Sequence, residues 1–113
     1  MIGPESDIYR MQQRAEEIAA RYAKLNAAQG HQEWGPREYT EGLVGDIGML
    51  MKLVMAKSGL RDIKEIDKKL RHEIGDSIWS LLVLCKRLNI DPAEAFAVTM
   101  DEIEERFQAR GAE

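Results

Sequence analysis

At 113 residues, with 44% hydrophobic and 32% charged side chains, the sequence predicts one folded domain over residues 1–113. Sixteen basic against 20 acidic residues give a net charge of −4, which argues against nucleic acid as a partner, since nonspecific binding needs a basic surface. The first residues lack a signal peptide's basic-then-apolar order, and no apolar run approaches the roughly 20 residues that span a bilayer, so we expect a cytoplasmic protein that binds no membrane.

The apolar residues recur with the period of α-helices. A first helix is predicted over about residues 4–28, with apolar residues at steps of three and four: Ile8, Met11, Ala15, Ile18, Tyr22 and Leu25. Gly30 interrupts this pattern. Pro36 suits the first turn of a second helix, because its missing N–H would be unpaired there. This helix is predicted over 36–57 and ends at Ser58-Gly59.

A third helix is predicted over 62–88 and a fourth over 92–109. Asn89 is a plausible stop between them. Asp91 and Pro92 then mark a restart, with Asp as the N-cap and Pro at the first helical position. No alternating strand pattern competes with these helices. The predicted fold class is therefore all-α, as a four-helix, bundle-like architecture.

The third helix is apolar on almost every side between Ile78 and Cys85. Such a segment needs cover on every side, and three other short helices can hardly provide it. We therefore expect a homo-oligomer, with this segment and Trp79 at the interface between subunits. The alternative is a central helix that its own chain surrounds. Cys85 is interpreted as a buried, inert thiol.

Three carboxylates lie at helix positions where apolar side chains would be expected. Asp46 falls among the leucines of the second helix, while Glu73 and Asp76 are three residues apart on one surface of the third. If these two helices pack antiparallel, we expect the three carboxylates to converge. Like charges in an apolar setting repel, so a cation should lie beside them. Oxygen ligands suit Mg²⁺ or Mn²⁺ rather than Zn²⁺.

Helical glycines near these acids favour a close approach by a ligand or a backbone. A glycine costs about 1 kcal/mol in a helix relative to Ala, and is tolerated most readily where such an approach occurs. The residues concerned are Gly42, Gly45, Gly48 and Gly75. The alternative is a solvated surface on which the acids form ion pairs, Glu73 with Arg71 or Lys69 and Asp46 with Lys52 or Arg37.

At these residues the sequence resembles the MazG-like nucleoside triphosphate pyrophosphohydrolases, whose signature is an E-x-x-E pair on one helix and an E-x-x-D pair on the next. Glu73-Ile74-Gly75-Asp76 matches the second pair. Asp46-Ile47-Gly48-Met49-Leu50 matches the first in its glycine and apolar frame. The segment Leu88–Phe96 resembles the family's continuation, and the likeness covers about residues 34–106.

The resemblance implies Mg²⁺-dependent hydrolysis of a nucleoside triphosphate to the monophosphate and pyrophosphate, by a helical homodimer or homotetramer. Asp46, Glu73 and Asp76 would bind the metal, and Glu73 and Asp76 are the candidate catalytic residues that position the water. Met49 stands where the family has the second acid of the first pair, and a thioether is too soft to replace a carboxylate on Mg²⁺. The alternative is therefore a catalytically impaired nucleotide-binding or regulatory oligomer, and a third possibility is a helical interaction protein.

Three further residues are candidates for substrate binding. Trp34, between the first two helices, could stack on a base, or could instead plug the top of the core. Lys52 and Lys57 could meet phosphates, although most lysines on helices are simply solvated.

Overall fold

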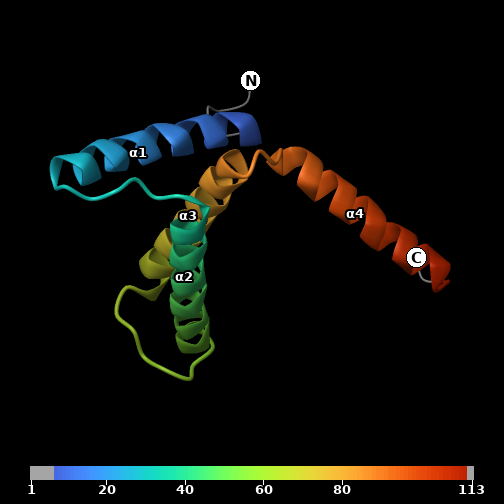
Figure 1. The fold of residues 1–113 in the computed structure, drawn as a ribbon. Coiled ribbons are helices and arrows are strands. Elements are labelled where there is room, and N and C mark those ends of the chain that lie inside the picture. Colours follow the sequence, from blue (N-terminus) through green and yellow to red (C-terminus); the bar gives the residue numbers. More distant parts are fainter. Residues whose placement is uncertain (1–6, 112–113) are drawn as a thin grey trace.

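The computed structural model describes residues 7–111, and in this range every regular element is a helix. The helices are α1 (Ile8–Ala28), α2 (Pro36–Lys57), α3 (Ile66–Arg87) and α4 (Pro92–Ala109) (Figure 1). The all-α prediction with four helices is confirmed. The bundle-like architecture and the oligomeric state stay predictions.

Two helices have the predicted bounds, and a third does not. Both α2 and α4 begin at the proline that was taken as their first residue. The third helix was predicted from residue 62, but α3 begins at Ile66, because Glu65 has a left-handed backbone with φ of 56°. It ends at Arg87, and Asn89, the predicted stop, is also left-handed with φ of 58°.

The predicted first helix ends at Ala28, as the structure has it. Residues 4–6 of that prediction lie outside the described residues. Within the described range α1 begins at Ile8, directly after its N-cap Asp7. The Asp7 carboxylate accepts a hydrogen bond from the Tyr9 N–H at 2.8 Å, which satisfies one of the unpaired donors of the first turn.

The two long middle helices form an antiparallel hairpin, and α1 lies across the end of it that is remote from the α2–α3 loop (Figure 1). The core cluster lies where the three helices meet: Ala15 and Ala19 of α1, Tyr39 of α2, and Leu82 and Val83 of α3. Val83 is fully buried. The two alanines present little side chain, so the backbone of α1 can approach α3 closely.

Trp79 packs inside its own chain instead of lying at the expected interface between subunits. Its indole N–H donates to the Ala15 carbonyl oxygen at 3.0 Å, which ties α3 to α1. Its ring lies 5.7 Å from that of Tyr22 and 5.5 Å from that of Tyr39, centroid to centroid. The chain therefore covers one side of the apolar segment of α3 itself.

A partly buried ion pair reinforces the same junction. Arg87 of α3 donates to both carboxylate oxygens of Glu16 on α1, at 3.0 and 2.9 Å, and its guanidinium lies 5.9 Å from the centre of the Tyr39 ring. Only about a quarter of each charged side chain is exposed (25% and 24%). Solvent therefore screens this pair less than it screens a surface pair.

We expect Glu16→Ala to lower the free energy of unfolding by about 1.5–3 kcal/mol, because it leaves the partly buried Arg87 without its main acceptor. Glu41→Ala is the matched control. Glu41 pairs with Arg37 on the surface of α2, with side chains 62% and 86% exposed, so its loss should amount to about 0.5 kcal/mol or less. Urea unfolding of both variants measures the difference, and equal losses would contradict the expectation.

The fourth helix is attached at its beginning only. Asp91, its N-cap, accepts hydrogen bonds from the N–H groups of Ala93 and Glu94, and from the Tyr9 hydroxyl at 3.1 Å. Beyond this end α4 projects away from the other three helices, and none of its residues is buried (Figure 1). Among the described helices, none has the length and apolar character to cross a lipid bilayer.

Candidate functional site

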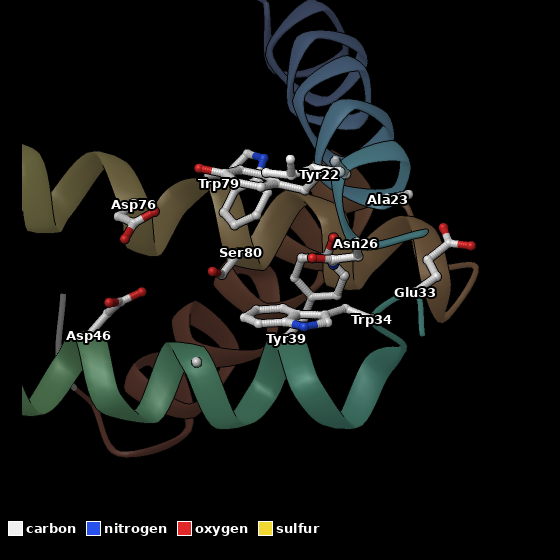
Figure 2. Close-up of a pocket in the computed structure, with 13 residues that line it drawn as sticks. Tyr22, Ala23, Asn26, Glu33, Trp34, Tyr39, Asp46, Asp76, Trp79 and Ser80 are labelled. Carbon is white, nitrogen blue, oxygen red and sulfur yellow. The ribbon is translucent and has the colours of Figure 1, made fainter. Parts of the chain in front are cut away.

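The three carboxylates singled out in the sequence meet between α2 and α3. One oxygen from each of Asp46, Glu73 and Asp76 can be chosen so that all three lie within 4.8 Å of one another. All three side chains are half-buried. Asp46 and Asp76 point toward each other across the hairpin (Figure 2). The antiparallel packing on which this convergence depended is therefore the arrangement that the chain adopts.

Helical periodicity explains why these acids face inward. Asp46 follows the buried Tyr39 by seven residues, or two turns, and so lies on the same side of α2. Asp76 precedes the buried Ser80 by four residues on α3. The buried Ser77 donates its hydroxyl hydrogen to the Glu73 carbonyl oxygen at 2.8 Å. Ser80 also lines a cavity beside Asp76, where its small side chain takes little space.

Within residues 7–111, no Lys or Arg forms an ion pair with any of the three acids. Arg37, one candidate partner of Asp46, pairs with Glu41 at 2.7 Å instead. Oε2 of Glu73 is buried and has no hydrogen-bond partner in the same range. A divalent cation bound by carboxylate oxygens fits this donor set, and would supply both the missing charge and the missing partner.

The environment of Asp46 disfavours its charged form. Burial raises the pKa of Asp46 above its ordinary value, and the charge of Asp76 raises it further. A hydrogen bond with Glu73 and the charge of His72 act in the opposite direction. The net shift is upward. The metal-free site therefore holds a proton more readily than an exposed aspartate does.

This shift predicts a pH-dependent gain in stability on replacing Asp46. Because the pKa of Asp46 is higher in the folded state than in the unfolded state, the metal-free protein loses stability as pH rises through the range between the two values. At neutral pH, which lies above this range, the full loss remains. In a chelator, Asp46→Asn should therefore unfold at higher urea concentration than the parent at pH 7, with a smaller difference below the ordinary Asp pKa. A variant less stable at pH 7 would contradict this.

An aromatic cavity of about 430 Å³ opens on one side of the acids (Figure 2). Asp46 and Asp76 lie in its wall, together with the amide of Asn26 and the carboxylate of Glu33. Its rings are those of Tyr22, Trp34, Tyr39 and Trp79. This volume is within the range of small-molecule sites, and its mixture of rings with a few polar groups suits a planar, partly polar ligand.

Trp34 and Tyr22 are the exposed rings of the aromatic cavity, and Trp34 comes from the loop before α2. It is 43% exposed and meets the Tyr39 ring edge-on, with centroids 5.4 Å apart. Gly42 lies directly beside it, where an added Cβ would be 3.6 Å from the indole ring. Of the four helical glycines, only Gly42 has such a neighbour. Gly45, Gly48 and Gly75 face open space, so no other described part of the chain approaches them, and the approach of a ligand stays a prediction.

A second cavity, of about 630 Å³, lies at the loop end of the hairpin. Glu73 is in its wall, so the acids separate the two cavities. A second acid, Asp62, also lines it, and three cationic residues outnumber the two acids: Lys52, Arg61 and Lys69. None of these three has an ion pair within the described part of the chain. This cavity therefore offers positive charge to an anion bound next to the carboxylates.

Two of the three residues predicted to bind substrate line a cavity beside the acids, and the third does not. Trp34 lines the aromatic cavity and Lys52 the cationic one. Lys57 instead forms an ion pair with Asp67 and lines neither cavity. Met49, which stands where the sequence resemblance would call for an acid, lies in the wall of the cationic cavity with Glu73.

Sequence reasoning missed several residues that line the two cavities. Tyr22 and Asn26 are four apart on α1, and this spacing placed them on one face without marking them as site residues. Arg61 lies in the loop after α2, and Lys69 in the first turn of α3. No pattern in the sequence distinguishes these two cations from solvated ones.

Comparison of the chain with family models, curated proteins and solved structures gives no match. The resemblance to the MazG-like family therefore stays a prediction from the sequence. The chemistry open to this site follows from its own groups, which are three acids between a ring-lined cavity and a cationic one.

Proposed function

We propose that this chain is a MazG-like, Mg²⁺-dependent nucleoside triphosphate pyrophosphohydrolase, which produces a nucleoside monophosphate and pyrophosphate. The observation that supports the proposal best is the convergence of Asp46, Glu73 and Asp76 without an ion pair to Lys or Arg in the described residues. Mn²⁺ suits the same oxygen ligands. No other group of acids, cysteines or histidines in the described range converges in this way.

The order of the three regions fits the parts of a nucleoside triphosphate. The base would enter the aromatic cavity and stack on Trp34, with the Asn26 amide as both donor and acceptor toward its edge. The phosphates nearest the sugar would lie at the acids. The terminal phosphates would lie in the cationic cavity beside Lys52, Arg61 and Lys69.

The expected reaction is attack by water at the bridge between the α- and β-phosphates. When bound, Mg²⁺ would polarise the phosphoryl oxygens. Besides holding the metal, Glu73 or Asp76 would position the attacking water and accept its proton through a carboxylate oxygen that the metal leaves free. The water oxygen bonds to the α-phosphorus, and the bond from this phosphorus to the oxygen that bridges to the β-phosphate breaks. The pyrophosphate that leaves is held by the cations of the second cavity.

Incubation with a panel of nucleoside triphosphates and Mg²⁺ or Mn²⁺ tests the proposal. We expect monophosphate and pyrophosphate in equal amounts, and no orthophosphate. A chain that releases no pyrophosphate from any of them, at any metal concentration, is not this enzyme.

The second candidate function is an impaired, nucleotide-binding relative, and Met49 is the observation that favours it. It predicts nucleotide-dependent thermal stabilisation without turnover. Either candidate would act as a homodimer or homotetramer, as the apolar third helix and the family resemblance led us to expect.

Met49→Glu separates the two candidates. It adds a carboxylate in the wall that also holds Glu73, so we expect Mg²⁺ affinity to rise on the order of tenfold, and pyrophosphate release to rise with it. Without metal the added charge should lower the melting temperature. Met51→Glu, on the exposed side of α2, is the control and should leave Mg²⁺ affinity unchanged. If Met49→Glu binds no more Mg²⁺ than the parent, position 49 is not part of the site.

A further inference from the structure

Trp34 is carried by a segment that has little support of its own. We refer to residues 31–35, which lie between α1 and α2, as the strap. The first N–H group of the strap donates to the Asn26 carbonyl oxygen at 2.7 Å, and the last donates to the Glu38 carboxylate at 2.7 Å. Between these ends, residues 32–34 make no backbone hydrogen bond to any part of the chain that the structure describes. A segment with so few backbone hydrogen bonds opens at lower free energy than the helices beside it.

Two side-chain contacts hold the strap in place. The Trp34 ring rests against the Tyr39 ring, with centroids 5.4 Å apart. Oε1 of Glu33 lies 3.6 Å from Nη2 of Arg87, and Glu33 has no other ion pair within the described residues. The Glu33 side chain is 64% exposed, so water and salt weaken this pair. The strap is therefore held by a contact that can open without unfolding the chain.

Both contacts lead to Arg87, which is itself fixed. Its guanidinium lies 5.9 Å from the centre of the buried Tyr39 ring. Glu16 of α1 accepts from it with both carboxylate oxygens, at 3.0 and 2.9 Å, and only 25% of the Arg87 side chain is exposed. Arg87 therefore packs against the ring on which Trp34 rests, and also pairs with the residue that precedes Trp34 in the chain.

We propose that Arg87 is a positioning residue for Trp34. Through Glu33 and Tyr39 it keeps the indole in the wall of the aromatic cavity, and the strap swings out when the Glu33–Arg87 pair opens. Gly30 lies directly before the strap and has φ of 77°, a backbone conformation that glycine adopts far more readily than other residues. The hinge of the movement is therefore placed at this glycine.

The consequence for ligand binding rests on the proposed function, whereas the position of Trp34 does not. A base that stacks on the indole binds the strap in its closed position. By linkage, such a base also favours the Glu33–Arg87 pair, and the pair favours binding of the base. Arg87 does not line the cavity, so it acts on the ligand through the strap. Salt screens the exposed pair, and so loosens this wall of the cavity.

Fluorine NMR of the full chain labelled with 5-fluorotryptophan tests the proposal. The chain has two tryptophans, and Trp79→Phe identifies the signal of Trp34. Relaxation dispersion of that signal gives the population of the open strap. We expect Glu33→Gln to raise this population roughly twofold to fivefold, which corresponds to the strength of an exposed ion pair. About 1 M NaCl should do the same to the parent and have little effect on Glu33→Gln, because the variant has no pair to screen.

Glu17→Gln is the matched control, since Glu17 is exposed on α1 and lines neither cavity. It removes the same charge and should leave the open population at the parent's value. If Glu33→Gln gives the same population as Glu17→Gln, the positioning role of Arg87 is overturned. It is also overturned if salt opens the strap of Glu33→Gln as much as it opens that of the parent.

Adenosine and cytidine at millimolar concentration separate this proposal from the proposed function. Each presents a base and a sugar without phosphate, and so needs no metal. We expect at least one of them to lower the open population of the parent. A strap that responds to Glu33→Gln and to salt, but to neither nucleoside, supports the role of Arg87 and removes base stacking from the proposed function.

Discussion

Asp76→Asn and Glu73→Gln should each reduce pyrophosphate release from the preferred nucleoside triphosphate by roughly a thousandfold. Either substitution keeps the size of the side chain and removes one negative charge from the group of three. The remaining two carboxylates bind Mg²⁺ more weakly, and each variant also loses one of the two acids that could accept the proton of the attacking water. Steady-state rates at saturating Mg²⁺, together with calorimetric titration of Mg²⁺, measure the two effects.

Glu41→Gln is the control for this pair of variants. Glu41 lies on α2 like Asp46, but its side chain is 62% exposed and pairs with Arg37 away from the acids. We expect its rate and its Mg²⁺ affinity to match those of the parent. If Asp76→Asn hydrolyses as fast as Glu41→Gln, then these acids do not hold the metal, and the proposed activity belongs elsewhere or nowhere on this chain.

The helix boundaries show which local signals can be read from the sequence. Both α2 and α4 begin at a proline, and Asp91 also caps α4 through its carboxylate, so their starts are fixed by local chemistry. The start of α3 has no such signal. Every residue from Asp62 to Glu65 is compatible with a helix, yet Glu65 adopts a left-handed backbone with φ of 56°. Glu65 makes no side-chain capping hydrogen bond either, so no local pattern marks that boundary in the sequence.

The positions of the acids could be predicted from the sequence, whereas the cavities could not. Asp46, Glu73 and Asp76 break the apolar pattern of regular helices, and periodicity then predicts where they point. The cavities depend on where α1 crosses the hairpin and where the loop after α2 runs. That path brings Asn26 and Arg61 to the site, and neither residue interrupts a pattern.

Trp79 illustrates the same limit within the core. The helix segment that contains it is apolar on almost every side, so the sequence does not tell which side of α3 faces α1 and which faces a partner. The structure settles this through one contact, the hydrogen bond from the Trp79 indole to the Ala15 carbonyl. The side of α3 that carries Trp79 and Val83 faces inward, and the side that carries Ile78 and Leu81 is left exposed.

We expect Trp79→Ala to lower the free energy of unfolding by about 3–5 kcal/mol. Trp79 contacts the rings of Tyr22 and Tyr39 and ties α1 to α3, and the buried core of this chain is small, so few other contacts can compensate. Trp79→Phe separates the two contributions. It keeps a ring in place and removes the hydrogen bond, so its loss should be closer to about 1 kcal/mol.

Trp34→Ala is the matched control for this prediction, because Trp34 lines the same cavity but is 43% exposed. Its replacement should lower stability by about 1 kcal/mol or less, and weaken nucleotide binding through the loss of a stacking surface. In urea unfolding, Trp79→Ala should therefore be the more harmful variant. In nucleotide titration of the folded proteins, Trp34→Ala should be the more harmful one. If both residues affect stability equally, Trp34 belongs to the core and is not free to stack on a base.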